Sequence, residues 1–311
     1  MKINLIIMSL LSILGINASA NNDGIKHFEY RYRGSIGGDS FSIEVNRATD
    51  TTPATITLDY MQHRDYGKLS SSVNEAFIDS IEALCEKYDI QKWDGFNETN
   101  HEVLDGSGFS LYVKYESGKS VNAYGNNSFP AGYRKFRSDL DELIKPEKER
   151  LFEEARQKKI EQGVEGKLKH MMINFIQHGN SGYDRYEIMI SEPQSDRSNI
   201  NVTVSSGNGD FFPKGHHIYY GTATNEEIGW DKFEALIKKY KIVTWMDYHK
   251  TAEDYSNAEW FQLGLSFEKG YISAMGSLPP DSNYDAFRHD ILKLLAEMIN
   301  KLVEKGSVKE S

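Results

Sequence analysis

Residues 82–93 read EALCEKYDIQKW and residues 234–245 read EALIKKYKIVTW, so one pattern occurs twice in this chain of 311 residues. Glu, Ala, Leu, Lys, Tyr, Ile and Trp coincide between the two stretches at one fixed offset. The same offset places Gly118 on Gly270, so the similarity continues beyond the stretch itself. The sequence therefore predicts two tandem copies of one unit.

The spacing of apolar residues predicts the elements around this stretch. Residues 28–32, 41–45 and 55–60 alternate apolar and polar side chains, as half-buried strands do. From Phe77 to Tyr88 the apolar residues follow a helical period, which is typical of an amphipathic helix. A second hairpin and a closing helix follow. The predicted order is β-β-β-α-β-β-α in each copy, and the predicted fold class is α+β, with an antiparallel sheet and helices packed on one face.

The repeat also divides the chain into segments. We expect a first α+β repeat at 21–145 and a second α+β repeat at 167–311. Residues 146–166 place Glu, Lys and Arg three and four positions apart, a spacing that supports an exposed helix. This segment is expected to be a charged helical connector that extends the last helix of the first repeat, with Pro146 at a break or kink.

The first twenty residues have the parts of a secretory signal peptide. A basic residue precedes a mainly apolar run at 3–16, and the Ala-Ser-Ala sequence at 18–20 supplies the small residues that a signal peptidase accepts. An uncleaved membrane anchor is the alternative, but the run is too short to span about 30 Å of hydrocarbon. We therefore expect 1–20 to be a cleavable signal peptide, Asn21 to begin the mature chain, and the protein to be periplasmic or secreted.

Composition argues against several classes of function. The chain carries 36 Lys and Arg against 46 Asp and Glu, a net charge of −10, so no nucleic acid partner is expected. The single cysteine excludes an intramolecular disulfide framework and any multi-cysteine metal site. No stretch after the signal segment approaches about 18 apolar residues, so no membrane span is expected in the mature chain.

No sequence motif indicates catalysis, a cofactor or a metal. The chain has no GxSxG elbow, no P-loop, no GxGxxG pattern after a strand and no HExxH pair. His216 and His217 are adjacent and would point to opposite faces of a strand, so the pair is a poor chelator by itself. Cys85 lies on the apolar stripe of the first helix, where we expect it to pack in the core. Catalytic, cofactor-binding and metal-binding residues are therefore left unassigned, and no cofactor is expected.

The tryptophans are the candidate ligand contacts. Trp93 and Trp245 end the two repeated stretches, where they could stack on a sugar or a peptide, or close the core between helix and hairpin. We favour the core for this pair, because tryptophan buries a large apolar area. Trp230 and Trp260 have no tryptophan counterpart in the first repeat, so they are better candidates for contacts specific to the second one.

A family resemblance is carried by the latter half of each repeat. Residues 87–95 follow the pattern Lys-Tyr-x-Ile-x-x-Trp-x-Gly, with Asp-Gly at 105–106 and Gly-Asn at 125–126 before an amphipathic helix. This pattern resembles a tandem domain of unknown function in uncharacterised exported proteins of Bacteroides-type bacteria. The second repeat departs from it, with Asp247 in place of the glycine. The resemblance implies a bacterial origin and a domain type, and it implies no activity and no functional residue.

Three classes of function remain open. We favour an exported non-enzymatic binding or interaction protein for an unknown protein or glycan ligand, because a repeated unit occurs without any catalytic motif. The alternatives are a secreted hydrolase that uses paired carboxylates and an envelope-associated scaffold. Similar clefts in both repeats would favour binding, and two convergent carboxylates of raised pKa would favour an enzyme. A surface without any concave patch would favour the scaffold.

Overall fold

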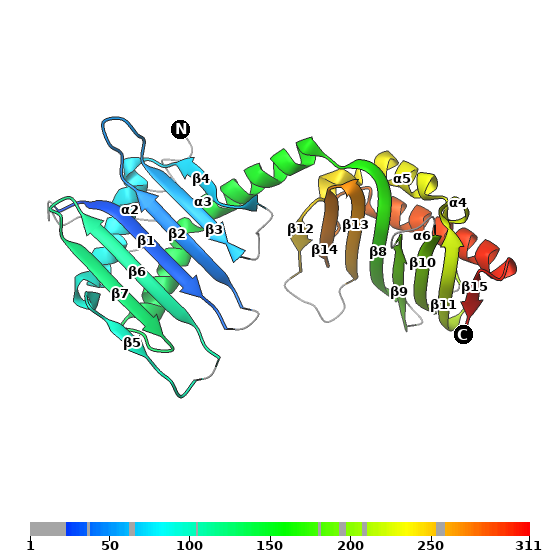
Figure 1. Ribbon diagram of the computed structural model, residues 1–311, viewed down its shortest axis with the longest axis horizontal. Helices are drawn as coiled ribbons and strands as arrows, with labels where there is room; N and C mark the ends of the chain where they lie inside the picture. The colour runs from blue at the N-terminus through cyan, green and yellow to red at the C-terminus, as the bar shows by residue number, and fades with distance from the viewer. Residues whose placement is uncertain are drawn as a thin grey trace. The chain divides into compact units, whose positions relative to one another are not determined.

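The computed structural model describes residues 23–35, 38–61, 66–103, 105–179, 182–192, 197–206, 210–252 and 259–311. The predicted signal peptide at 1–20 lies outside these residues. The chain divides into two compact units, Met1–Ala155 and Arg156–Ser311 (Figure 1). Each unit contains a sheet and helices of its own, so the fold class is α+β.

The first unit is built on a seven-stranded sheet with the order β4-β3-β2-β1-β6-β7-β5. Its strands are β1 (Ile25–Arg33), β2 (Ser40–Asn46), β3 (Thr55–Tyr60), β4 (Leu69–Ser72), β5 (Asn97–Thr99), β6 (Gly108–Tyr115) and β7 (Ser120–Asn126). The other elements are helix α2 (Glu75–Lys87), the 3-10 helix η2 (Ile90–Trp93) and helix α3 (Tyr133–Gln162). In Figure 1 both α-helices lie behind this sheet, which leaves its other face open.

The second unit is built on an eight-stranded sheet with the order β12-β14-β13-β8-β9-β10-β11-β15. Its strands are β8 (Glu165–Gly179), β9 (Gly182–Ser191), β10 (Arg197–Ser206), β11 (Gly215–Thr224), β12 (Tyr248–Lys250), β13 (Trp260–Lys269), β14 (Tyr271–Gly276) and β15 (Val308–Glu310). Its helices are α4 (Asn225–Ile228), α5 (Trp230–Lys239), η3 (Ile242–Trp245) and α6 (Tyr284–Glu304). Read from β11 to β12, the strands are connected in the same order as the first sheet read from β4 to β5. In the part of the chain that the structure describes, no helix combines the length and apolar character needed to cross a membrane.

Both sheets contain strands that the apolar pattern does not predict. The sequence predicts three strands before the first long helix of each unit, and the structure has four, because β4 and β11 are additional. Strand β4 reads Leu-Ser-Ser-Ser and has no buried residue, so it lacks the alternation that marks a strand. The three-residue strands β5 and β12 pair in parallel with β7 and β14, so the sheets are not purely antiparallel as predicted.

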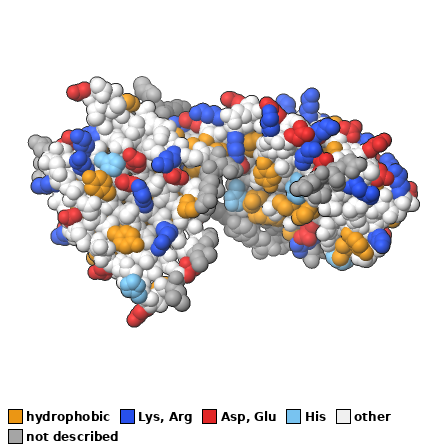
Figure 2. Space-filling model, viewed as in Figure 1, with side chains coloured by type: hydrophobic (Ala, Val, Ile, Leu, Met, Phe, Trp, Pro, Cys, Tyr) orange, Lys and Arg blue, Asp and Glu red, His pale blue; other side chains and the backbone are white. Residues whose placement is uncertain are grey.

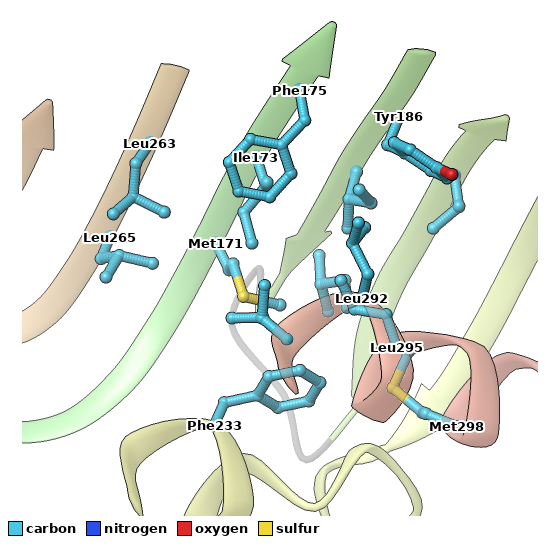
Figure 3. Packing of buried hydrophobic residues seen from close by; sticks show 14 of the residues in the cluster. Met171, Ile173, Phe175, Tyr186, Phe233, Leu263, Leu265, Leu292, Leu295 and Met298 are labelled. Atoms are coloured by element: carbon cyan, nitrogen blue, oxygen red, sulfur yellow. The ribbon is translucent and has the colours of Figure 1, made fainter. Parts of the chain in front are cut away.

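Alternation along the central strands separates a helix-facing side of each sheet from an open side. In β2 and β3 every second side chain is buried, which directs the residues between them to the opposite face. Figure 3 shows the helix-facing side of the second unit, where Phe175 and Leu263 from the sheet share one cluster with Phe233 of α5 and Leu295 of α6. A separate cluster fills the first unit. Each unit therefore buries its apolar residues in its own core.

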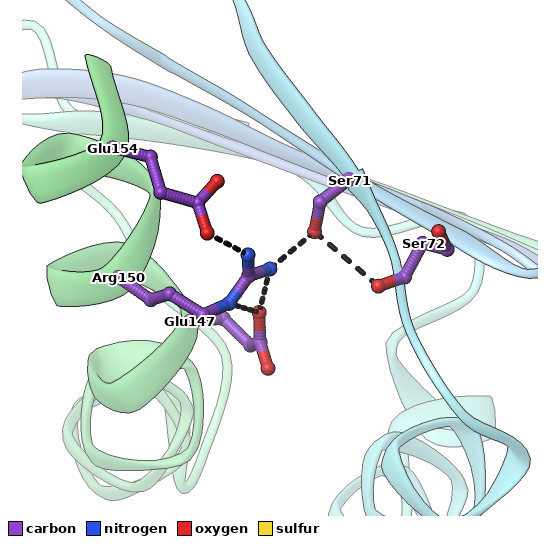
Figure 4. A network of polar contacts seen from close by, with 5 residues as sticks. All are labelled: Ser71, Ser72, Glu147, Arg150 and Glu154. Carbon is purple, nitrogen blue, oxygen red and sulfur yellow. Dashed lines mark hydrogen bonds and ion pairs between the residues drawn. The ribbon is translucent and has the colours of Figure 1, made fainter. Parts of the chain in front are cut away.

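Helix α3 continues through Pro146, where the sequence predicts a break or kink. Proline removes one main-chain donor, yet the next turn is anchored to the sheet. Arg150 donates to Glu147 over 2.6 Å and to Glu154 over 2.7 Å, and it reaches Ser71 of β4 over 2.6 Å (Figure 4). Leu151 beside it is buried in the first core. The first unit thus uses residues beyond the predicted end of its repeat at 145.

The repeated stretch makes the same polar contact in both units. Lys87 Nζ and Tyr88 OH donate to Asp139 Oδ2 over 2.8 and 2.6 Å, which ties the end of α2 to α3. The corresponding Lys-Tyr pair in the second unit donates to Asp290 Oδ2 of α6 over the same two distances. The ammonium group of Lys239, followed by the tyrosine hydroxyl, lowers the pKa of the Asp290 carboxyl. These residues therefore serve helix packing in each unit.

Candidate binding site on the first sheet

The open face of the first sheet carries a mixed set of polar and aromatic side chains. Buried residues of β1, β6 and β7 alternate with outward ones, because successive strand residues point to opposite faces. The outward residues near the middle of these strands are Glu29, Arg31, Ser110, Tyr112, Asn122 and Tyr124. Figure 2 shows charged side chains on the visible face of the first unit, with separate hydrophobic ones among them.

A hollow of about 440 Å³ lies on this face. It is lined by Glu29, Gly95, Phe96, Asn97, Ser110, Leu111, Tyr112, Asn122, Ala123 and Tyr124. The segment between η2 and β5 closes one side. The Gly95 N–H donates to the Asn122 carbonyl over 2.9 Å, and the Tyr124 N–H donates to the Phe96 carbonyl over 2.8 Å. Because these bonds hold the segment against β7, this side of the hollow has a fixed position.

Two tyrosines on paired strands line the hollow. Tyr112 lies opposite Asn122, and Ser110 lies opposite Tyr124, so the two rings are diagonal neighbours. Diagonal positions in such a ladder are about 7–8 Å apart, within reach of aromatic side chains. The Tyr124 side chain is 45% exposed, and the Tyr112 ring contacts His27 with 5.6 Å between ring centroids. The hollow therefore offers ring faces and hydrogen-bonding groups in one patch.

A smaller hollow of about 170 Å³ adjoins the first, because Ser110 and Tyr124 line both. Arg31 and Arg33 of β1 line its other side. In the ladder between β1 and β6, Arg31 lies opposite Ser110 and Arg33 lies opposite Gly108. The small residues at these two positions leave space beside the guanidinium groups. We refer to the two adjoining hollows together as the groove.

The two arginines of the groove differ in their partners. Arg31 Nε donates to Glu29 Oε1 over 2.6 Å, and the Arg31 side chain remains 66% exposed. Arg33 Nη2 donates to the amide oxygen of Asn126 over 2.9 Å. Arg33 makes no ion pair with any residue that the structure describes. The groove thus contains one guanidinium paired with a carboxylate and one paired with a neutral amide.

The open face of the second sheet has a different composition at the same ladder positions. Gly264 lies between Met172 and Ser273, where the first sheet has Tyr112. The Tyr271 hydroxyl lies over this glycine, since a Cβ added to Gly264 would be only 2.5 Å from it. Figure 2 shows hydrophobic side chains gathered on the visible face of the second unit. The second sheet therefore has a glycine in place of Tyr112 at this ladder position.

The structure places three of the four candidate tryptophans in the cores. Trp93, Trp245 and Trp230 are 4%, 2% and 8% exposed. The ring of Trp93 packs on Phe136 of α3, and the ring of Trp245 packs on Phe287 of α6, each with 5.2 Å between ring centroids. These side chains contact core residues of their own units.

Trp260 is the candidate tryptophan that keeps solvent-facing surface. It is half-buried at the start of β13, opposite Ile176 of β8. None of the four tryptophans lines the groove. The sequence motifs do not single out the residues that line the groove. Tyr112 and Tyr124 stand at outward positions of predicted strands, and this alternation is the signal that could have identified them.

Cys85 and the adjacent histidines His216 and His217 do not line the groove. Cys85 is buried in the first core, and burial raises the pKa of its thiol. His216 Nδ1 lies 2.8 Å from Ser205 Oγ of β10, whereas His217 Nδ1 lies 2.6 Å from Glu310 Oε1 of β15. Among the described residues, no group of three or more His, Cys, Asp and Glu side chains is placed to hold a metal ion.

Comparison with known proteins does not assign this chain to a family. No family model matches this chain, and no curated protein matches it. Membership in the exported proteins of Bacteroides-type bacteria therefore stays an expectation from the motif residues.

Proposed function

We propose that this protein is an exported, non-enzymatic binding protein and that the groove on its first sheet binds carbohydrate. The observation that carries the proposal is the patch of Tyr112, Tyr124, Ser110 and Asn122 in a hollow of about 440 Å³. Sugar rings present C–H faces that pack on aromatic rings, and they present hydroxyls that bond to amide, hydroxyl and carboxylate groups. The patch supplies partners for both kinds of surface.

The position of the groove favours a saccharide over an extended peptide. Strands β1, β6 and β7 are paired with neighbours, so their main-chain groups are engaged within the sheet. A peptide that binds as an added strand needs a free edge with unpaired main-chain groups. A ligand in the groove contacts side chains instead, and these offer hydroxyl, amide and carboxylate groups to a hydroxyl-rich molecule.

The groove gives less support to the hydrolase and the scaffold. Glycoside hydrolysis usually needs two carboxylates about 5–10 Å apart. Glu29 is the single carboxylate among the residues that line the groove, all of which the structure describes, and it is bonded to Arg31. A scaffold that only spaces other components requires no concave patch. Binding is therefore the function that this arrangement favours.

The proposal includes an origin by duplication and export to the periplasm or the medium. The shared order of strand connections and the repeated Lys-Tyr-Asp contacts support duplication of one α+β unit. The sequence of 1–20 supports export. N-terminal sequencing of the exported protein is expected to find Asn21 first, and a retained Met1 would contradict cleavage.

Mutation of the two outward-facing tyrosines, Tyr112 and Tyr124, tests the binding site. Affinities for a panel of neutral and acidic oligosaccharides are measured on an array and by calorimetry. Tyr124→Ala and Tyr112→Ala are expected to weaken binding about tenfold each, equivalent to about 1.4 kcal/mol, because each removes a stacking surface. Tyr220→Ala is the matched control, since Tyr220 is 48% exposed and lies on β11 of the second sheet.

Two outcomes would contradict the proposed site. One is unchanged affinity in Tyr124→Ala and Tyr112→Ala, with the loss appearing in Tyr220→Ala instead. The other is a wild-type protein that binds no oligosaccharide of the panel. Thermal melts of all variants establish that they are folded, and the outward position of these tyrosines predicts little change in melting temperature.

A further inference from the structure

The arginine end of the groove carries more positive charge than the neighbouring carboxylate compensates. Arg31 and Arg33 are two residues apart on β1, so they point to the same face of the sheet. Arg31 is bonded to Glu29, and Arg33 is bonded to the neutral side chain of Asn126. Among the described residues, Arg33 has no carboxylate partner, so one of the two guanidinium charges is without an ion pair there, on a chain whose net charge is −10.

Small residues of β6 lie beside both guanidinium groups. A Cβ added to Gly108 would lie 3.8 Å from Arg33 Nη2 and 3.6 Å from Asn126 Oδ1, so the polar ends of these side chains lie beside the glycine. Ser110, two residues further along β6, lies opposite Arg31. Tyr124 lines the same small hollow. An anionic group placed there would contact guanidinium donors while the ring that carries it lies against Tyr124.

The geometry points to a saccharide that bears an acidic group, a carboxylate or a sulfate, as the ligand of the groove; this inference rests on the proposed function. The donors of a guanidinium form a planar fork that matches two oxygens of such a group, and charge-assisted bonds of this kind are stronger than neutral ones. A neutral sugar would fill the tyrosine patch and leave the Arg33 charge without a counter-charge. An acidic sugar uses both parts of the groove.

Calorimetry on the full chain with four probes tests this inference. The probes are tetragalacturonic acid, its methyl-esterified form, a sulfated carrageenan tetrasaccharide and a tetraglutamate peptide. The wild type is expected to bind the acid at least tenfold more tightly than the methyl ester, and added salt should reduce this difference because exposed charges are screened. The sulfated probe shows which of the two anionic groups the groove prefers.

Substitution of both arginines tests whether they are responsible for the preference for the acid over the methyl ester. The Arg31→Gln/Arg33→Gln variant should bind the acid only as tightly as it binds the ester, so the ratio of the two affinities should fall from at least tenfold to about one. The Arg31→Lys/Arg33→Lys variant keeps the charge without the fork and should be intermediate. Arg185→Gln is the matched control, because Arg185 of β9 contacts Glu187 two residues away, as Arg31 contacts Glu29. Thermal melts verify folding of each variant.

The outcomes separate this inference from the proposed function. Equal affinity for the acid and the ester, with Tyr124→Ala weakening both, overturns the acidic ligand and leaves carbohydrate binding intact. Selectivity that survives Arg31→Gln/Arg33→Gln also overturns it. Binding of tetraglutamate without binding of any saccharide overturns both, because the ligand is then an acidic peptide. Failure of every probe to bind likewise overturns both.

Discussion

Leu84 and Leu236 occupy the same place in the repeated stretch but are buried to different extents. Leu84 is 0% exposed in the first core, whereas Leu236 is only partly buried and packs against the second core. Leu84→Ala is expected to cost about 2–5 kcal/mol, because it removes buried carbon atoms and leaves a cavity. Leu236→Ala should cost about 1–2 kcal/mol, because part of its surface is already in water.

Urea unfolding of the two variants measures this difference. Because each unit has its own core, the transition of the first unit should shift in Leu84→Ala and that of the second unit in Leu236→Ala. Equal losses of stability in the two variants would contradict the burial difference. The sequence alone predicts equal losses, since the two leucines align and lie on equivalent apolar stripes.

At the scale of single residues, the sequence predicts burial better than it predicts contacts at the surface. Cys85 follows the apolar period of its helix, and the large apolar area of Trp93 and Trp245 favours the core; all three residues are buried. Tyr112 lies between two buried residues of β6, and this alternation shows that it points outward without showing what lies beside it. The groove depends on which outward residues face each other across three strands, and that follows from the register of the ladder rather than from spacing along the chain.

At the scale of elements, a histidine adds a side-chain contact to the main-chain pairing between β11 and the C-terminal strand β15. His217 Nδ1 lies 2.6 Å from Glu310 Oε1, and His217 Nε2 lies 3.1 Å from the Lys214 carbonyl oxygen. Both ring nitrogens can therefore donate when the imidazole is charged. The bond to the Lys214 carbonyl, followed by the bond and charge of Glu310, raises the pKa of His217 above its ordinary value of 6.5.

The docking of β15 should therefore weaken as pH rises. A raised pKa in the folded state means that the contribution to stability is fully present below about 6.5 and is lost as pH passes through the higher folded-state value. Hydrogen exchange at Val308 and Lys309, corrected for intrinsic rates, is expected to show increased opening across that range. His217→Gln should remove the pH dependence, and His216→Gln serves as the control on the opposite face. Opening that does not change with pH in the wild type would refute this linkage.

Elements with a strong apolar period could be predicted, and the others required the three-dimensional structure. Strand β3 and helix α2 have buried residues at regular intervals, which is the pattern that periodicity detects. Strands β4 and β5 contain no buried residue and exist because a neighbouring strand offers main-chain partners. Pro146 gives a stop signal, but α3 continues because contacts from the next turn hold it on the first unit.

At the scale of the whole molecule, the two separate cores predict that each unit folds alone when it is cut at the right residue. The first unit extends to Ala155 and the second begins at Arg156, within helix α3. A fragment ending at 145 loses Leu151, which is 4% exposed, and Phe152, whose ring lies 5.5 Å from that of Tyr60. Burial of a leucine side chain contributes about 1.5–3 kcal/mol, so this truncation should be costly.

Fragment 21–155 is therefore expected to melt cooperatively and at a higher temperature than fragment 21–145. Fragment 156–311 should also fold, because it retains Arg156, whose Nε donates to the Met246 carbonyl over 2.7 Å, and Lys159, which lies 2.9 Å from Asp247. Calorimetry of the three fragments, alone and mixed, measures their melting temperatures and shows whether each fragment melts cooperatively. Equal melting temperatures for 21–145 and 21–155 would show that the residues after Pro146 add nothing to the first core. Fragments 21–155 and 156–311 that fold only when mixed would show that the two cores are not independent.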